Sequence, residues 1–388
     1  MKIARVEARA HSMRFDGVAL RFGVGNMVKR DCVVVRVETD TGIVGWGEAH
    51  HGLAPTAVAE VVNHSLAPLV VGADAMDREG IWARLYRAQM GTHGSGAAAV
   101  MGSSGIDIAL WDIAGKALGL PVCRLMGGTP KRVRAYAGGL ALGFQPLETL
   151  EKEVAALVAA GWTAIKLRVG DTTKRDAERV THIRRTFGDD LDIAVDAQTR
   201  YSVLDIADVV AYCEKNRVWW LEEPFTPDNI DGFLALRRRT ATPLAAGENH
   251  FTRQAFRELL RTGALDILQA DCTKAGGISE VKKIADMAGA WHLHLAPHTS
   301  QSVLSAAANL HVLGAAPNGL VYEADLAVTN PYRDRLAKNP PVVKDGHIDI
   351  PDGPGLGVDI DPTVLDAYPP IPGPSYVSPW LTDGETKR

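Results

Sequence analysis

Three short apolar runs, each ending in an acidic residue and each followed by a helix-like segment, recur at a constant spacing in the middle of the chain. The acids are Asp196, Glu222 and Glu248, and each stands 26 residues after the one before it. A buried parallel strand reads as a short continuous apolar run, and the helix that leads back to the next strand needs about a dozen residues or more. The spacing therefore predicts three successive strand–helix units, with their acids at the same end of a parallel sheet or barrel.

The three acids together predict a metal site. A lone acid at a strand end is more often a helix cap or a solvated loop residue than a metal ligand. Three carboxylates in one partly buried place repel one another, so a positive group should lie among them. Oxygen ligands without Cys or His suit a hard cation such as Mg2+, which keeps positions open for water or substrate oxygens.

The alternation of strand and helix continues on both sides of these units. Counting from Val133 gives eight strand-like runs. This number, together with the right-handed crossovers of strand–helix–strand units, predicts a barrel, and barrel enzymes carry their active sites on the C-terminal rim. Further functional groups stand where these runs end, namely Lys166, Arg168, Asp271, His298 and Glu323.

Two pairs among these groups are informative. Lys166 and Arg168 are two residues apart on one strand, so both should point to the barrel interior. Asp271 lies on the strand next to that of His298 and could orient its imidazole. An imidazole held by a carboxylate is a general acid or base tuned towards neutral pH.

The chain before the barrel predicts a separate α+β domain. Strands are expected at Ile3–Ala10 and Cys32–Glu38, with a hairpin into Ile43–Glu48, and apolar residues spaced by three and four predict helices from about 55 to 120. Met13–Arg30 is either a floppy connection or a lid over the site. The histidines in this part lie in glycine-containing loops and are expected to be solvated or packed more often than to contact a ligand: His50, His51 and His93.

Composition narrows the class of partner. The hydrophobic content of 46%, the charged content of 23% and the net charge of −4 are ordinary for a globular protein, and no basic run suggests nucleic acid or an anionic membrane. The four cysteines are scattered, which predicts reduced thiols. The N-terminus is charged and no apolar run approaches the length of a membrane span, so we expect a cytoplasmic protein with a small-molecule substrate.

At this point the residues resemble a known family. The chain resembles the mandelate racemase subgroup of the enolase superfamily over nearly its whole length. The motifs that carry the resemblance are Lys166-Leu167-Arg168, Asp196, Glu222-Glu223-Pro224, Gly247-Glu248-Asn249, Asp271 with Lys274-Ala275-Gly276-Gly277, Pro297-His298, and Glu323. The muconate-lactonizing subgroup would be expected to have Lys in place of Asp271 and Asp in place of Glu248, and neither is found.

The resemblance implies a fold and a set of roles. The fold is α/β, with a (β/α)7β TIM-like barrel over residues 126–330. An N-terminal α+β capping domain over residues 1–125 is completed by the C-terminal segment 331–388. The implied roles are Mg2+ on Asp196, Glu222 and Glu248, a His298–Asp271 dyad, and a hydrogen bond from Glu323 to the substrate carboxylate. A homo-oligomer is implied as well. We expect Lys274 to be a turn and helix-start residue rather than a base. We expect Glu223 to be structural or to support the metal ligands rather than to bind the metal directly.

One position departs from the family pattern. Members with two bases carry Lys-x-Lys, whereas here the second position is Arg168. Arginine stays protonated and is a poor base, although its planar group could hold a carboxylate or an enolate oxygen. The sequence therefore predicts one good base, His298, and with it a reaction that needs only one.

These inferences predict a Mg2+-dependent dehydratase of a sugar acid that gives a 2-keto-3-deoxy acid. The alternatives are a cycloisomerase of a sugar-acid lactone or anhydro sugar acid, then a racemase or epimerase, and last a barrel that binds a metabolite without turnover. Candidate substrate contacts are Gln198, His50, and Thr299 with Ser300 and Gln301, although Thr299 or Ser300 could instead cap a helix. Arg21, with Arg14 and Lys29, is a candidate for binding a second carboxylate.

Overall fold

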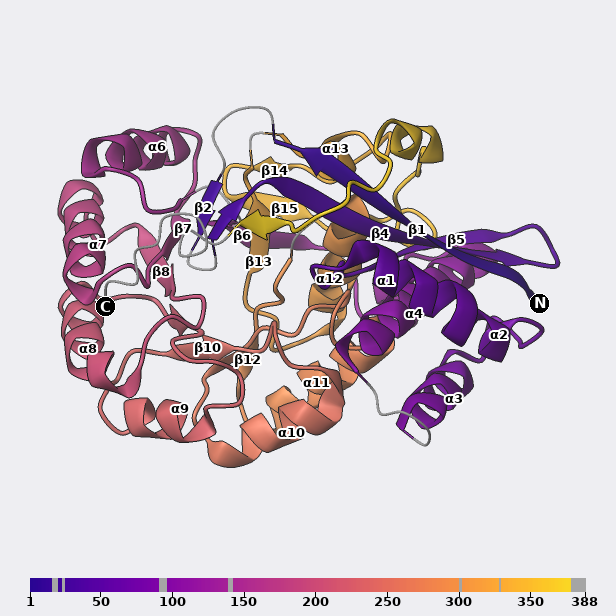
Figure 1. Ribbon diagram of the computed structural model, residues 1–388, viewed down its shortest axis with the longest axis horizontal. Coiled ribbons are helices and arrows are strands. Elements are labelled where there is room, and N and C mark those ends of the chain that lie inside the picture. Colours follow the sequence, from indigo (N-terminus) through magenta and orange to yellow (C-terminus); the bar gives the residue numbers. More distant parts are fainter. Residues whose placement is uncertain are drawn as a thin grey trace.

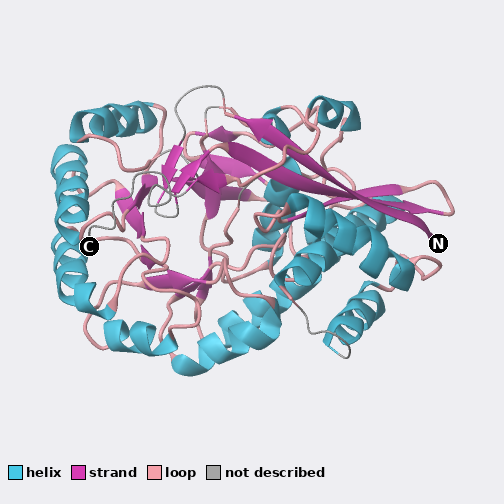
Figure 2. Ribbon diagram, in the orientation of Figure 1, coloured by secondary structure: helices cyan, strands magenta, loops and turns pink. Residues whose placement is uncertain are grey.

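The computed structural model describes residues 1–15, 20–22, 25–90, 96–138, 142–299, 302–327 and 329–377. In Figure 1 an arc of helices surrounds a set of strands, and the N-terminal sheet and helices lie beside this barrel. Figure 2 shows the same arrangement by element type, with the helices on the outside of the barrel and the strands within it. The fold is that of a TIM barrel with an N-terminal capping unit.

The capping unit is built on a three-stranded antiparallel sheet in the order β1–β4–β5. Its strands are β1 (Ile3–Arg14), β4 (Lys29–Thr39) and β5 (Val44–Ala49). The central strand β4 is buried on both faces, because Val33 and Val35 pack on the capping helices while Cys32 and Val34 pack in the main core. A strand covered on both faces reads as a continuous apolar run, as the sequence of β4 does.

Helices cover one face of this sheet. They are α1 (Pro55–Glu60), the π-helix η1 (Val61–Leu66), α2 (Ala67–Val70), α3 (Arg78–Met90) and α4 (Ala97–Leu118). A methyl group on Gly45 or Gly47 of β5 would lie 2.1 Å from a backbone oxygen of α4, so glycine is what allows the helix to approach this closely. By length and hydropathy alone α4 could cross a membrane, but 89% of that window is buried inside the protein, where α4 is a core helix.

The barrel strands run parallel in the order β6 to β12, and β13 pairs with β6 to complete the set. They are β6 (Arg132–Gly138), β7 (Ala164–Arg168), β8 (Asp192–Asp196), β9 (Leu221–Glu222), β10 (Leu244–Ala246), β11 (Ile267–Leu268), β12 (His294–Leu295) and β13 (Tyr322–Asp325). A bridge between Leu295 and Gly319 brings the last two strands together. The helices between them are α6 (Leu147–Ala159), α7 (Thr173–Phe187), α8 (Ile206–Lys215) with the short η2 (Val203–Asp205), α9 (Ile230–Arg237), α10 (Thr252–Thr262), α11 (Ile278–Ala290) and α12 (Val303–Ala315).

A layer of side chains fills the barrel beneath the strand ends. It contains small residues such as Ala164, Ala194 and Ala245, together with Trp220 packed edge-on against Tyr136. Because strand side chains alternate, the residues two positions further along point the same way, and these include Lys166, Asp196 and Glu222. The barrel is thus closed below and carries its polar groups at the C-terminal rim.

The C-terminal segment returns to both parts of the molecule. Strands β14 (Val343–Lys344) and β15 (His347–Asp349) extend the barrel sheet by antiparallel pairing of β15 with β6. Beyond the 3-10 helix η3 (Pro362–Ala367), strand β16 (Tyr376–Val377) pairs with β3 (Gly25–Met27), which in turn pairs with β2 (Leu20–Phe22). The short helices α5 (Val122–Leu125) and α13 (Pro331–Asp334) lie at the joins between these parts. The tail therefore packs on a barrel strand as well as on the capping unit.

Candidate active site

The three strand-end acids lie on consecutive barrel strands. Asp196 and Glu222 are the last residues of β8 and β9, are direct register partners, and are buried. Glu248 stands two residues past β10, after Gly247 with φ +142°. A methyl group on Gly247 would lie 2.8 Å from the backbone nitrogen of Gln269, so a residue with a side chain would strain this turn. The structure thus places all three acids at one rim.

Each of these acids contacts a positive group. Glu222 Oε1 lies 2.6 Å from Lys166 Nζ, and Asp196 forms an ion pair with Arg168. Among the described residues, no group of three or more His, Cys, Asp and Glu side chains lies close enough together to hold a metal ion. The Mg2+ ligands therefore stay a prediction at this point.

Lys166 bridges two carboxylates. Its Nζ lies 2.6 Å from Glu222 Oε1 and 2.7 Å from Glu323 Oε1. Burial lowers the pKa of Lys166, but the two carboxylates outweigh burial and raise it overall. Burial likewise raises the pKa of Glu323, but Lys166 outweighs it and the net shift is downward. A hydrogen bond donated by Glu323 to the substrate carboxylate, as the family resemblance implies, needs a protonated or proton-sharing carboxyl group, whereas Lys166 as its partner favours the ionised carboxylate.

His298 is held between two acids. Its Nδ1 lies 2.8 Å from Asp271 Oδ2, and its Nε2 lies 3.0 Å from Glu248 Oε2. Asp271 is fully buried and also accepts hydrogen bonds from the backbone and hydroxyl of Thr273 and from Asn309 Nδ2. Because Asp271 is fixed in this way, it orients the ring through Nδ1, and Nε2 is the nitrogen that faces the strand-end acids through its contact with Glu248.

The loops after the strands adopt unusual backbone conformations. Gln198 has φ +46°, Thr199 +60° and Glu223 +38°, a region that residues with side chains rarely occupy. Such strain persists where the surroundings hold it in place, and it is concentrated at functional sites. Both Gln198 and Glu223 line the cavity described below.

Two local predictions are wrong. Lys274 lies in a turn, as predicted, but α11 begins only at Ile278, so Lys274 does not begin the helix. Its Nζ lies 3.3 Å from Asn249 Oδ1 and 3.8 Å from Glu248 Oε1. Ser302, not Thr299, caps the following helix by accepting a hydrogen bond from Leu304. Thr299 instead donates its backbone N–H to Glu323 Oε2 at 3.2 Å. Ser300 lies outside the described residues, so the alternative that it caps the helix is not tested there.

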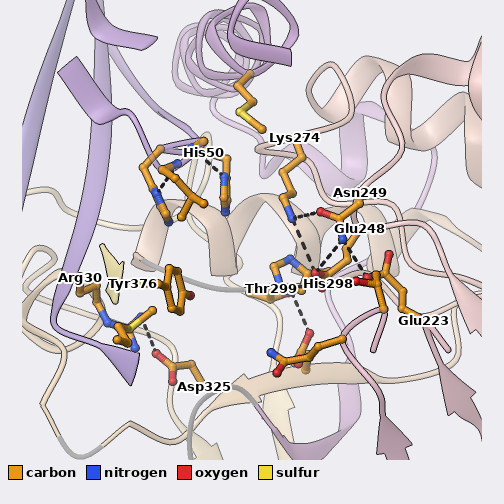
Figure 3. Close-up of a pocket in the computed structure, with 18 of the residues that line it drawn as sticks. Arg30, His50, Glu223, Glu248, Asn249, Lys274, His298, Thr299, Asp325 and Tyr376 are labelled. Carbon is orange, nitrogen blue, oxygen red and sulfur yellow. Dashed lines mark hydrogen bonds and ion pairs between the residues drawn. The ribbon is translucent and has the colours of Figure 1, made fainter. Parts of the chain in front are cut away.

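A cavity of about 350 Å3 joins these groups. Its barrel side contains Arg168, Gln198, Thr199, Glu223, Glu248, Asn249, Lys274, His298, Thr299, Glu323 and Asp325. Its other side comes from the capping unit and the tail, with Met27, Arg30, His50, His51, Gly52, Leu53, Met101 and Tyr376. Figure 3 shows Arg30, Tyr376 and His50 on one side of this space and Glu248, Glu223 and Lys274 on the other.

The cavity brings together several predicted residues. Gln198, His50 and Thr299 line it, as does His51, for which sequence reasoning favoured a packing role. Arg30, Lys274 and Tyr376 also line it, and sequence reasoning did not name them as contacts. Lys29 does not line it, because its Nζ is 2.5 Å from the Ile371 carbonyl and 3.3 Å from Asp31. The side chain of Arg21, and all of His93, Ser300 and Gln301, lie outside the described residues.

The two cavity histidines share one hydrogen-bonding pattern. His50 Nδ1 accepts from the Gly52 N–H at 3.1 Å, and His51 Nδ1 accepts from the Leu53 N–H at 3.0 Å. A ring nitrogen that accepts a hydrogen bond carries no proton, so the proton of each neutral ring is on Nε2. Burial lowers the pKa of His51 to about 4 and that of His50 well below its usual value. Both rings therefore present an N–H donor at neutral pH.

Comparison with known proteins gives one consistent family. Residues 8–127 match the family described as mandelate racemase / muconate lactonizing enzyme, N-terminal domain, and residues 149–364 match the family described as enolase C-terminal domain-like. A curated relative, the arabinonate dehydratase of Saccharolobus solfataricus, is 36% identical over 87% of this chain and 90% of its own length. Another, the D-galactarolactone cycloisomerase of Agrobacterium fabrum, is 32% identical over 95% of this chain and 99% of its own length.

Solved structures agree with this assignment. A member of the enolase superfamily from Polaromonas sp. JS666 has a TM-score of 0.94 and 42% identity, covering 97% of this chain and 100% of that one. A racemase from Streptomyces coelicolor A3(2), solved with bound magnesium, has a TM-score of 0.86 and 30% identity, covering 94% of this chain and 99% of that one. The chain belongs to the enolase superfamily, in its mandelate racemase subgroup.

Proposed function

We propose that this chain is a Mg2+-dependent hydro-lyase that removes water from a sugar acid and releases a 2-keto-3-deoxy acid. The observation that carries the proposal is the His298–Asp271 pair, with Asp271 fully buried, on the same rim as Lys166 and the strand-end carboxylates. Removing a proton next to a carboxylate is difficult because a second negative charge develops on oxygens that already carry one. A site for this reaction needs one base and several positive groups, and both are present here.

Asp196, Glu222 and Glu248 would hold the metal ion. They are three hard oxygen donors at the ends of adjacent strands, which is the donor chemistry that Mg2+ prefers. The rim carries more carboxyl groups than cationic ones, so a divalent ion would improve its charge balance. When bound, Mg2+ would place positive charge beside the substrate oxygens that become negative. A similar structure, the Streptomyces coelicolor A3(2) racemase, contains magnesium.

His298 would be the base. Asp271 fixes the ring through Nδ1, so Nε2 takes the proton from the carbon next to the substrate carboxylate. The electron pair of the broken C–H bond then moves into the carboxylate, which gives an enediolate. The Lys166 ammonium would stabilise that charge, while Glu323 keeps Lys166 in place through the 2.7 Å contact.

The same imidazole would complete the elimination. The enediolate returns its electron pair to form a carbon–carbon double bond, the C–O bond at the next carbon breaks, and protonated His298 gives its proton to the departing hydroxide. The products are water and an enol, and the enol becomes the 2-keto acid. One base on one face of the substrate is enough for this sequence.

Arg168 argues against racemisation as the main reaction. A racemase needs a second base on the opposite face of the substrate, and Arg168 occupies the position where two-base relatives carry a lysine. Its guanidinium stays protonated and forms an ion pair with Asp196. A racemase or epimerase therefore ranks below a reaction with one base, and a barrel that only binds a metabolite ranks lowest because the base and its orienting group are both in place.

Relatives support a dehydratase. Curated relatives include an arabinonate dehydratase at 36% identity and a D-galactonate dehydratase from Ralstonia nicotianae at 35% identity, and each covers at least 85% of this chain. The second candidate is a cycloisomerase of a sugar-acid lactone, which also needs one base. It is favoured by the D-galactarolactone cycloisomerase, whose alignment spans 95% of this chain.

The remaining assignments concern substrate contacts, domain limits, assembly and location. We assign substrate contacts to Gln198, His50 and Thr299, which line it beside His298. We also propose a capping domain over residues 1–125, a barrel over 126–330, a C-terminal segment over 331–388, and a homo-oligomer located in the cytoplasm.

A screen of the Mg2+-loaded protein tests the function. The purified chain is incubated with a library of mono- and dicarboxylic sugar acids and their lactones, and 2-keto product is measured. Dehydration predicts 2-keto acid, with loss of one water, from at least one open-chain acid. Cycloisomerisation predicts a 2-keto acid of unchanged mass from a lactone and none from the open-chain acids. Deuterium entering through both faces of the substrate carbon would contradict the single-base mechanism.

A further inference from the structure

Arg30 occupies an unusual place in the cavity wall. It is the second residue of β4, its side chain is 1% exposed, and it lines the cavity together with Met27 and Tyr376. One terminal nitrogen, Nη1, lies 3.0 Å from Asp325 Oδ2, at the end of barrel strand β13. In Figure 3 Arg30 lies on the opposite side of the space from Glu248, beside which the proposed reaction takes place.

The rest of the Arg30 guanidinium has no partner. Its Nε and Nη2 are both buried and make no hydrogen bond. These two nitrogens share one edge of the planar group, and their N–H bonds point in the same direction, as the two oxygens of a carboxylate require. Buried donors without partners are rare and costly in folded proteins, so an unpaired pair on one edge points to a ligand.

Asp325 and the two cavity histidines are poor acceptors for a substrate hydroxyl. Asp325 is occupied, because its Oδ1 accepts from the Ala327 N–H at 3.0 Å and its Oδ2 accepts from Asn330 Nδ2 at 2.9 Å as well as from Arg30. His50 and His51 use Nδ1 to accept backbone N–H groups, so the other nitrogen of each neutral ring is a donor and not an acceptor. A terminal alcohol needs an acceptor for its proton, whereas a carboxylate needs donors alone.

We propose that Arg30 binds a second carboxylate of the substrate through Nε and Nη2, so that the substrate is a dicarboxylic sugar acid or its monolactone. This inference rests on the proposed function for the identity of the first carboxylate. Among the cations first considered for this role, Lys29 is engaged by Asp31 and by a backbone carbonyl, and Arg14 does not line the cavity. Because the free edge of Arg30 is closed to solvent, direct contact with the acid would require neighbouring side chains to shift.

Matched pairs of acids test this assignment. The Mg2+-loaded His298→Asn protein, which would not consume substrate, is titrated calorimetrically with galactarate and galactonate, glucarate and gluconate, and xylarate and xylonate. Each pair differs only in whether the far carbon is a carboxylate or an alcohol. We expect at least one diacid to bind about tenfold to a hundredfold more tightly than its partner, as for charge-assisted hydrogen bonds. If no diacid binds more tightly than its partner, the assignment is wrong.

A conservative variant locates the effect. Arg30→Lys keeps the charge beside Asp325 but removes the planar fork, so in the same background it should weaken the diacid by about tenfold or more and change the monoacid by less than about threefold. The control is Arg333→Lys, because Arg333 also approaches Asp325, at 3.9 Å, but does not line the cavity. Equal losses for both acids in Arg30→Lys would overturn the assignment. If Arg30→Lys fails to fold, the comparison of diacids with monoacids in the His298→Asn protein still tests the assignment.

The outcomes separate this inference from the proposed function. Tight, Arg30-dependent binding of a diacid without any 2-keto product from the wild-type protein would keep the ligand class and reject the dehydratase. Dehydration of monoacids with no preference for diacids would keep the dehydratase and reject the role of Arg30.

Discussion

The two sides of the cavity differ in how they are built. The barrel side carries acids and bases at the ends of consecutive strands, and nearly every charge there has a partner of opposite sign, as Lys166 has in Glu222 and Glu323. The capping side comes from segments far apart in the chain, such as Arg30 in β4 and Tyr376 in β16. On this side, two buried nitrogens of Arg30 make no hydrogen bond. The barrel side thus has charged partners within the chain and would gain a metal ion, whereas the free donors of Arg30 on the capping side would be paired by a substrate.

This difference suggests a division of labour. Groups that make and break bonds must be held rigidly, and strand ends supported by a packed layer of side chains provide that rigidity. Groups that select a substrate can lie on loops and terminal strands, where changes cost the fold less. We therefore expect changes on the barrel side to remove turnover and changes on the capping side to alter which acid binds and how tightly.

Metal removal should have the largest effect. Chelation with EDTA should lower turnover by about ten-thousandfold or more, because the developing charge would then lie among uncompensated carboxylates. Adding Mg2+ back should restore it, and calorimetry should show one Mg2+ site that is lost in Glu222→Gln. Full activity after exhaustive chelation would contradict the assignment of Asp196, Glu222 and Glu248.

Replacing the proposed base, His298, should have the second-largest effect on turnover. His298→Asn should lower kcat by about a thousandfold, within the usual range for a positioned general base, while Mg2+ binding stays intact. The matched control is His182→Asn, which breaks another histidine–carboxylate pair, with Glu151 at 2.6 Å, on the outer helices of the barrel. Unchanged turnover in His298→Asn would reject the dyad.

A capping-side histidine should give a smaller effect of a different kind. His50→Ala removes one N–H donor from the cavity and should raise KM by about fivefold to tenfold with kcat within about threefold, the usual value of one hydrogen bond. His64→Ala serves as control because His64 is 77% exposed in the same capping unit. A loss in kcat as large as that of His298→Asn would mean that the capping side takes part in the chemistry.

The barrel side was also the part that the sequence could predict. The apolar runs before Asp196, Glu222 and Glu248 indicate buried strands. An acid that directly follows such a strand must lie at its C-terminal end, so the same pattern also gives the position of the acid. The exact strand limits were less predictable. One of the eight strand-like runs begins at Trp291 in the sequence, but in the structure Trp291 follows the end of α11 and is 54% exposed. An apolar side chain at a helix end is easily mistaken for the start of a strand.

The capping side could not be predicted in the same way. Arg30 was placed at the end of a connection because a Lys-Arg-Asp run looks solvated, yet all three residues are buried in β4. Their burial depends on partners such as Asp325 and the Ile371 carbonyl, which are distant in sequence and carry no local signal. Lys274 was missed for a similar reason, since its role follows from the approach of Asn249 and Glu248 in space.

The smallest effect is expected at the contact between the capping unit and the barrel. Asp107 of the capping helix α4 is buried against barrel helix α11, where it accepts hydrogen bonds from the hydroxyl of Ser279 at 2.6 Å and from its backbone N–H at 2.9 Å. Burial raises the pKa of Asp107 to about 7, although these hydrogen bonds and the nearby Arg78 and Lys283 oppose the shift.

A raised pKa in the folded state has a definite consequence for stability. Between about pH 4 and pH 7 the unfolded chain loses this proton while the folded chain keeps it, so the contribution of Asp107 to the free energy of unfolding falls as pH rises, by at most about 1.4 kcal/mol per pH unit. Asp107→Asn cannot titrate and should show a shallower decline in urea unfolding over this range. Asp286→Asn, at a 58% exposed position on α11, should keep the wild-type slope. Parallel curves for wild type and Asp107→Asn would mean that Asp107 does not titrate in this range. The contact between α4 and α11 would then contribute equally to stability from about pH 4 to pH 7.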